Sequence, residues 1–260
     1  SGRRELADAI AAPDNPLTAR VIVNRLWASF FGQPLVASPS NFGRSGQLPT
    51  HPELLDDLAV RFVENGWSTK SLIREFVLSA TYRQTSRGPV HASDPENQLL
   101  ARMNRKRLSI EQWRDAVLFY SGDLSQEGGQ SLELTDENNF RRTVYGRVSR
   151  LKLNDTLMQF DYPDANVHAE QRPVTTTPIQ KLFVLNSPFI LARSSALAGR
   201  LEENADPVRA AYRLLFSRAP TSSEHQAAHQ FLSETLESEY RPLAQFAQIL
   251  FASNEFLYVD

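Results

Sequence analysis

The chain has 260 residues, of which 41% are hydrophobic, 10% aromatic and 22% charged, and its formal net charge is -2. These are ordinary values for a globular protein, and they exclude a disordered chain. A nearly neutral chain also lacks the positive field that binding to a phosphate backbone needs. The absence of cysteine excludes disulfides, thiolate metal sites and covalent haem attachment within the chain.

Two further features of the sequence bear on its setting. Its apolar runs are all shorter than a membrane span, and its first residues do not have the pattern of a signal peptide. We therefore expect a soluble chain with no cofactor of its own, no nucleic-acid partner and no direct insertion into a membrane.

The length allows one large domain or two modest ones. We expect a single domain over residues 1–260. The composition shifts to Gly, Pro, His and Ser over residues 86–95, which indicates an exposed connection. Two subdomains that pack together, residues 1–88 and 96–260, are therefore also compatible with the sequence.

Capped apolar stripes dominate the first half of the chain. A long segment rich in Pro, Gly and Ser, residues 33–50, interrupts them, and loops of this kind are often functional. After it, Thr50 and Glu53 have the spacing of a capping box. Helices are predicted over residues 4–11, 17–31, 53–65, 71–84 and 110–122.

The second half begins irregularly and then becomes helical again. Residues 140–153 show the best strand alternation in the chain, so we predict a short strand or extended arm there. Further helices are predicted over residues 178–186, 207–219, 225–238 and 243–256, and another starts at Pro188. The fold class is therefore all-α, a compact array of roughly nine or ten helices with long polar loops and at most a minor strand element.

The segment 160–190 concentrates turn-forming, acidic, hydroxyl and apolar residues more than any other window. Thr177, Pro178 and Gln180 have the pattern of a helix N-cap, a first-turn proline and the far end of a capping box. Apolar residues then repeat at helical spacing with few charges, so we expect a helix inside the protein. The segment thus predicts a polar loop that leads into a buried helix.

Carboxylates and amides in this loop suggest a cation site. Asp161, Asp164, Asn166, His168 and Glu170 place five possible ligands within ten residues, and oxygen donors from a loop suit calcium. The spacing matches no standard calcium loop, because it lacks the turn glycine and the downstream bidentate Glu. Turn formation and capping explain these residue types more simply, so we expect no metal here.

The end of the same loop suggests an anion site. Arg172 with Thr175, Thr176 and Thr177 precedes a helix N-terminus, where backbone N–H groups, hydroxyls and a guanidinium can hold an anion. Ordinary capping by threonine is the simpler alternative. Both interpretations stay open at this point.

Asn24 and Arg25 lie in the most apolar helix of the first half of the chain. A buried arginine is rare without a partner, so we expect Arg25 to form an ion pair with Asp161 or Asp164. Such a pair would join the first helices to the central loop, in a structural rather than a catalytic role.

Other signals of chemistry are weak. His225 and His229 have the i, i+4 spacing of a two-histidine metal site, but no third ligand is evident in the sequence, so we expect them to face solvent. No nucleophile elbow, phosphate loop or dinucleotide fingerprint occurs. Trp27, Trp67 and Trp113 could line a groove, although tryptophan among apolar neighbours is more often part of a core.

Seven sequence blocks carry a resemblance to a known family. They are RRELADAIAAPDNPLTARVIVNRLW, FGQPLVASPSNFG, THPELLDDLAVRFVENGWSTKSLIREFVLSATYRQ, RLSIEQWRDAV, FDYPDAN, TTTPIQKLFVLNSPF and SNEFLYVD. The chain resembles the planctomycete PSD-type domain of unknown function, family 1553, over nearly its whole length. It departs from the family pattern at Ala165, where a proline is common.

The resemblance implies an extracytoplasmic helical module, periplasmic or at the cell surface, that is joined in a parent protein to a cytochrome-c-like domain. Haem is expected only in that upstream domain, because this chain has no Cys-x-x-Cys-His site. We expect a non-catalytic interaction module whose partners are neighbouring domains of the parent protein, or a surface protein or polysaccharide. The alternative is a hydrolase-like enzyme with the 160–177 loop in its cleft and Asp161 or Asp164 as acid or base.

Overall fold

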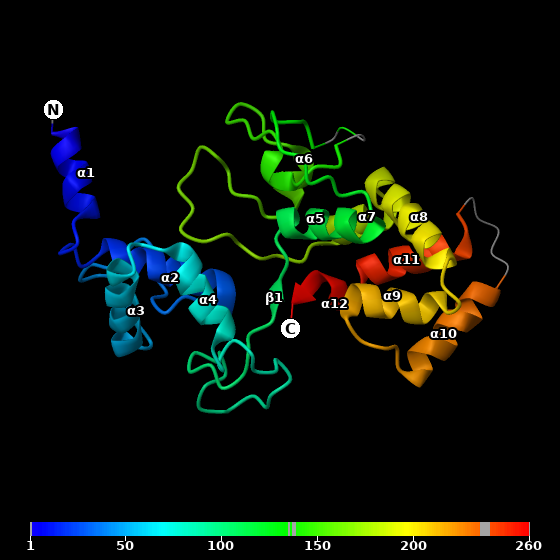
Figure 1. The fold of residues 1–260 in the computed structure, drawn as a ribbon, viewed down its shortest axis with the longest axis horizontal. Coiled ribbons are helices and arrows are strands. Elements are labelled where there is room, and N and C mark those ends of the chain that lie inside the picture. Colours follow the sequence, from blue (N-terminus) through cyan, green and yellow to red (C-terminus); the bar gives the residue numbers. More distant parts are fainter. Residues whose placement is uncertain (1, 135, 137–138, 235–239, 260) are drawn as a thin grey trace. The chain divides into compact units, whose positions relative to one another are not determined.

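A computed structural model describes residues 2–134, 136, 139–234 and 240–259 of the chain. The all-α prediction is confirmed, because the described residues form twelve α-helices, one short 3-10 helix and two strands of two residues each (Figure 1). The chain divides into two compact units, residues 1–106 and residues 107–259. The segment 86–95 thus lies within the first unit rather than at the division.

The first unit is built on α2 (Thr18–Phe31) and α3 (Pro52–Glu64), which pack on each other, and on α4 (Thr69–Leu78). Every residue of α1 (Arg3–Ala11) is exposed. The rings of Trp27 and Phe31 stack with centroids 3.9 Å apart, and Phe76 meets the Trp27 ring edge-on at 5.3 Å. Trp27 is therefore a core residue, in line with the simpler of its two interpretations.

The loop of residues 33–50 is held by a buried polar side chain near its start and by a tight backbone turn farther along. The buried amide of Asn24 donates to the carbonyl of Val36 at 3.0 Å and accepts from its N–H at 2.8 Å. Farther along, a Cβ on Gly46 would lie 2.0 Å from the Asn41 carbonyl oxygen, so only glycine fits there. The loop is thus an ordered part of the first unit.

The second unit contains most of the helices. In chain order they are α5 (Ile110–Ser121), η1 (Thr143–Tyr145), α6 (Asp155–Gln159), α7 (Pro178–Asn186), α8 (Pro188–Glu202), α9 (Pro207–Phe216), α10 (Ser222–Ser233), α11 (Pro242–Ala252) and α12 (Asn254–Leu257). The packing of α8 on α11 forms its centre, where Ile190, Leu197 and Phe251 are fully buried. The two-stranded sheet pairs β1 (Lys106–Arg107) with β2 (Tyr258–Val259).

Local capping signals were reliable guides to where helices begin. Complete capping boxes, with both reciprocal bonds, occur at Ser109, Thr177 and Thr221. The box predicted at Thr50 and Glu53 is wrong: α3 begins at Pro52 with His51 at the N-cap position, and the Thr50 hydroxyl bonds to the Leu35 carbonyl.

Of the short strand or extended arm predicted over residues 140–153, the strand is wrong. Part of this segment forms η1, and Val144 and Val148 are 69% and 47% exposed, so the alternation has no core to face. Instead, the buried guanidinium of Arg114 holds the segment through the carbonyl groups of Arg141 at 3.0 Å and Asn139 at 2.5 Å. Burial lowers the pKa of Arg114, and these carbonyls replace part of its lost hydration.

The prediction of a buried helix over residues 178–186 is correct about the helix and wrong about its burial. On α7 the side chains of Ile179, Leu182 and Leu185 are 61%, 57% and 49% exposed, whereas Gln180 and Val184 face the core. Hydropathy alone therefore assigned the wrong face to the inside.

Within the described residues, no single helix is long and apolar enough to cross a membrane. The helices α7 and α8 meet that test of length and composition only as a pair, with a bend of 49° between them.

Candidate functional site

The loop from Phe160 to Thr177 is closed by a clasp between Asp161 and Thr175. The carboxylate of Asp161 accepts from the Thr175 backbone N–H at 2.8 Å and from its hydroxyl at 2.7 Å. Asp161 has a positive φ of 62°, a left-handed conformation that aspartate tolerates better than most residues. These bonds fix the two ends of the loop together.

A buried arginine supports this clasp. The side chain of Arg107 is only 9% exposed and lies 4.0 Å from the Asp161 carboxylate. It donates to the Thr175 carbonyl and, at 3.0 Å, to the side-chain oxygen of Gln180. The amide of Gln180 then donates to the Gln159 carbonyl at 2.8 Å, so the loop, α6 and α7 share one network.

The cation beside Asp161 is therefore Arg107, from the basic segment that precedes α5. The burial predicted for Arg25 is wrong, because that side chain is exposed and its neighbour Asn24 occupies the buried position on α2. Asn24 has the structural role described above. Arg25 and the loop aspartates belong to separate units, so their pairing stays a prediction.

Arg172 is engaged by an acid of α5 rather than by the threonines near it in the sequence. Its guanidinium donates to both carboxylate oxygens of Glu111, at 2.7 and 2.9 Å, and lies over the ring of Tyr162 at 4.9 Å. Thr177 caps α7, and Thr176 is exposed. The capping interpretation thus accounts for Thr177.

Asp164 and Asn166 form a turn of their own. One oxygen of Asp164 accepts from the backbone and side-chain N–H groups of Asn166, at 2.8 and 3.1 Å, and Asn166 also donates to the Arg150 carbonyl at 3.0 Å. Among the described residues, the group of side chains with metal-ligand geometry is Asp206, His225 and His229, and the loop acids are not part of it.

Next to the clasp lies a small pocket of about 120 Å³, lined in part by Arg107, Trp113, Asp161 and Arg172. The indole N–H of Trp113 is buried, and it finds no hydrogen-bond partner within the part of the chain that is described. Pockets that bind drug-sized ligands measure about 300–1,000 Å³, so this one is too small to enclose a sugar chain.

A wider hollow of about 590 Å³ lies beside α9. Its basic side chains are Arg200, Arg209 and Arg213, and Asp206 is the acid in its wall. Arg200 donates to the Tyr120 carbonyl at 2.5 Å, and Arg209 bonds to Asp206 at 3.2 Å. A single carboxylate that is already bonded does not provide the pair of acids used for general acid–base hydrolysis.

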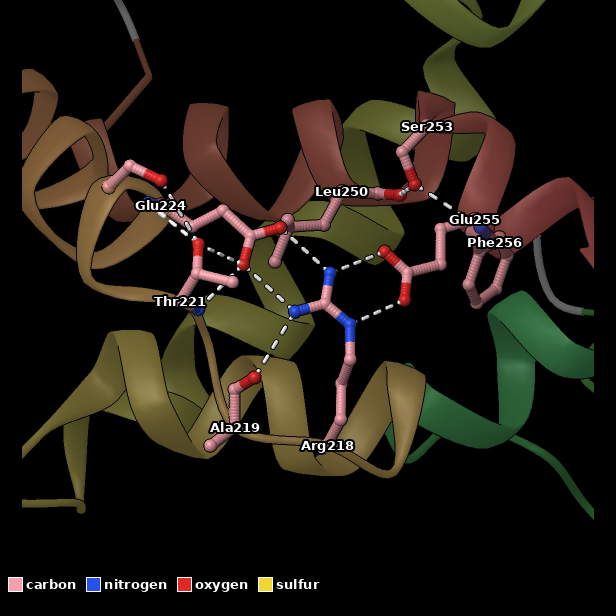
Figure 2. A network of polar contacts seen from close by, with 9 residues as sticks. Arg218, Ala219, Thr221, Glu224, Leu250, Ser253, Glu255 and Phe256 are labelled. Carbon is pink, nitrogen blue, oxygen red and sulfur yellow. Dashed lines mark hydrogen bonds and ion pairs between the residues drawn. The ribbon is translucent and has the colours of Figure 1, made fainter. Parts of the chain in front are cut away.

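An ionic cluster of the second unit surrounds Arg218, which meets two glutamates (Figure 2). Its guanidinium forms a two-bond contact with Glu224, at 2.7 and 2.8 Å, and another with Glu255, at 2.6 and 2.7 Å. Glu224 also accepts from the Thr221 N–H at 2.7 Å, as part of the box that caps α10. The bond to Arg218 is the main reason that the pKa of Glu224 falls to about 2.

These contacts tie the loop after α9 to α10 and α12, and the two carboxylates raise the pKa of Arg218 above its ordinary value. Each polar group is matched by a partner inside the protein, which indicates a structural role.

Comparison with known proteins gives a family and no function. The model of the family PSD1, described as a protein of unknown function (DUF1553), matches residues 2–232. Neither a curated protein nor a solved structure matches the chain. Since the match covers most of its length, the chain belongs to the PSD1 family of proteins of unknown function (DUF1553).

Proposed function

We propose that the chain is a non-catalytic interaction module that binds a protein partner through the exposed apolar face of α7. The observation that carries the proposal is the row of Ile179, Leu182 and Leu185, exposed by 61%, 57% and 49%. These residues follow one another at a spacing of three, so they share one side of the helix. Contiguous exposed aliphatic side chains are typical of a surface that another protein covers.

The rest of α7 is anchored, which keeps this face in a fixed place. Gln180 belongs to the network of the clasp, and Val184 is 2% exposed in the core. At the end of the helix the Gln248 side chain of α11 donates to the Leu185 carbonyl at 2.6 Å. A preorganised surface loses little conformational entropy on binding, which favours affinity.

The chemistry of the face favours protein over polysaccharide. A row of aliphatic side chains on a helix fits an apolar groove of a protein partner. It offers neither an aromatic ring on which a sugar could stack nor a charged group for an anionic chain. We take the partner to be a neighbouring domain of the parent polypeptide, in the extracytoplasmic setting that the family resemblance implies.

The alternative, a hydrolase-like enzyme, has less support. Asp161 is engaged by Thr175 and Arg107, and Asp164 forms its own turn with Asn166. Within the described part of the chain, the lining of the pocket beside the clasp has Asp161 as its one carboxylate, and neither aspartate lines the hollow beside α9.

The proposal is tested with Leu182→Glu, which places a charge in the middle of the apolar face. Leu151→Glu is the matched control, because Leu151 is 98% exposed and lies outside α7. Both variants should keep the helical circular dichroism of the native chain. The remaining domains of the parent protein are produced separately and titrated with each form by calorimetry.

We expect the native chain and Leu151→Glu to bind one of these domains equally, and Leu182→Glu to bind at least about tenfold more weakly, a loss of about 1.4 kcal/mol. Equal binding by Leu182→Glu would contradict the role of α7. Binding to a polysaccharide and to none of the parent's domains would contradict the choice of partner.

A further inference from the structure

Three side chains from two helices converge on one point of the second unit. Asp206 caps the N-terminus of α9, and His225 and His229 lie one turn apart on α10. The Nε2 atom of His225 lies 3.0 Å from Asp206 Oδ2 and 3.3 Å from the Nε2 atom of His229. Each residue offers one ligand atom, and the three atoms lie within 4.8 Å of one another.

Hydrogen bonding alone does not account for this arrangement. A neutral imidazole nitrogen either carries a hydrogen and donates, or carries a lone pair and accepts. If His225 Nε2 donates its hydrogen to Asp206, it has neither a free hydrogen nor a lone pair for His229, which is 3.3 Å away. One nitrogen thus has two close partners, and its single hydrogen can make a full-strength bond to one of them or a weaker, shared bond to both.

We propose that Asp206, His225 and His229 bind a divalent transition-metal ion of the zinc class. Zinc–ligand bonds are about 2.0–2.1 Å long, so two ligand atoms at a tetrahedral ion lie about 3.3–3.4 Å apart. The distance between the two Nε2 atoms, 3.3 Å, matches this separation, and the 3.0 Å contact to Asp206 is close to it. Three protein ligands leave at least one coordination position for water or an external group.

The cluster also has the supporting contacts that hold a ligand in place. One oxygen of Asp206 accepts from the Arg209 backbone N–H at 2.9 Å, which fixes the carboxylate with its other oxygen toward His225. Arg209 Nε lies 3.2 Å from that other oxygen. Because a carboxylate oxygen has two lone pairs, it can bind an ion and still accept from Arg209.

The kind of ion follows from the donor set. Two imidazoles and one carboxylate suit zinc and its neighbours among the divalent transition metals, whereas calcium and magnesium prefer oxygen ligands alone. The side chains of His225 and Asp206 are each 32% exposed, so an ion can reach the site from solvent.

The experiment uses the full chain without an affinity tag, freed of metal by a chelator that is then dialysed away. Zn²⁺ is titrated by calorimetry, and Co²⁺ serves as a spectroscopic probe, because its visible absorption is strong only in a tetrahedral site. The variants are His229→Gln and Asp206→Asn. The second keeps the helix cap, because asparagine caps as well as aspartate. His91→Gln is the control, an exposed histidine of the other unit.

We expect one Zn²⁺ per native chain, and a loss of affinity of at least about tenfold in each of the two variants, as removal of a ligand or its support causes. The His91→Gln variant should bind as the native chain does. Zn²⁺ should also raise the thermal midpoint of the native chain and leave that of His229→Gln unchanged.

Three results would overturn the proposal. They are an absence of heat and of any thermal shift with excess Zn²⁺, unchanged affinity in His229→Gln and Asp206→Asn, and an equal loss in His91→Gln.

Discussion

Two polar clusters connect α9 to α10, one at each end of α9. At its C-terminal end, Arg218 meets Glu224 and Glu255, and every bond has a donor and an acceptor (Figure 2). At its N-terminal end, the Nε2 atom of His225 has two close partners, the Asp206 carboxylate and the Nε2 atom of His229. The two ends of α9 thus give one network in which each bond has its own donor and acceptor, and one in which two contacts share a single ring nitrogen.

Whether every donor and acceptor in a cluster has its own partner is a better guide to a structural or a binding role than the types of residue in the cluster. A network in which all donors and acceptors are matched gains nothing from an added ligand. Where several nitrogen and oxygen lone pairs share one hydrogen, as at Asp206, His225 and His229, a bound cation adds stabilising contacts. The following predictions test this contrast, from the largest expected effect to the smallest.

Arg218→Met should have the largest effect on stability. It removes the cation between Glu224 and Glu255, so two carboxylates, each about one third exposed, are left to face each other. We expect a loss of about 2–3 kcal/mol, less than for a fully buried pair because solvent screens part of the repulsion. Urea unfolding followed by circular dichroism measures it.

Arg241→Met is the control, because Arg241 is 58% exposed and its ion pair within the described residues is with Glu202. Its loss should stay below about 1 kcal/mol. Equal losses in the two variants would show that the Arg218 cluster is no more than a surface contact.

Lowering the pH should reduce the stability of the second unit, because Glu224 becomes protonated. Its pKa is lowered from 4.5 to about 2 in the folded protein, chiefly by Arg218, so the unfolded chain binds the proton first. The stabilisation is therefore complete above about pH 5 and lost as the pH falls toward 2, by about 1–2 kcal/mol after allowance for solvent screening. Thermal unfolding from pH 2 to 6 should show a shallower decline for Glu224→Gln than for the native chain.

Glu202→Gln is the matched control, since Glu202 is 47% exposed and, in the part of the chain that the structure describes, pairs with one arginine, Arg241. It should keep the native slope. If Glu224→Gln shows the same pH dependence of stability as the native chain, Arg218 does not lower the pKa of the Glu224 carboxyl. The pKa of Asp206 is also about 2, lowered chiefly by the backbone N–H of Arg209. Asp206 therefore adds a similar pH dependence to the native chain and to each variant.

His229→Gln in metal-free buffer should have the smallest effect. The His229 ring is exposed and, among the described residues, its Nε2 atom has one long contact, 3.3 Å to the Nε2 atom of His225, so we expect a change within about 0.5 kcal/mol. Urea unfolding in the presence of a chelator measures it. A loss as large as that of Arg218→Met would mean that the histidine pair is itself a stabilising network, contrary to the contrast drawn above.

The sequence predicted the helical architecture well, because its signals are local. The caps at Ser109, Thr177 and Thr221 depend on residues only three positions apart, and all three occur. Burial depends on what packs against a helix, which the sequence does not contain. For that reason the exposed stripe of α7 was expected inside, and Arg25 was expected to be buried where Asn24 is.

The candidate sites were predicted only in part, for the same reason. The arginine beside Asp161 is Arg107, whose signal in the sequence was its place in a basic segment directly before a helix, and the pairing of Arg25 with a loop aspartate stays a prediction. The spacing of His225 and His229 on α10 was noted, but the pair was expected to face solvent. The nearby Asp206 had no signal as a ligand, because it lies 19 residues before His225 and has the sequence pattern of an ordinary helix cap.

One buried side chain of the first unit has a consequence for how the family can vary. The amide of Asn24 satisfies both backbone groups of Val36, so it needs a donor and an acceptor at a fixed reach. An aspartate has no N–H group to donate to the Val36 carbonyl, so that contact would bring two acceptors together. A glutamine would add a methylene group to a site that is fully buried. Natural selection therefore has one residue that fits this position, and related chains that keep the 33–50 loop should have inherited asparagine there.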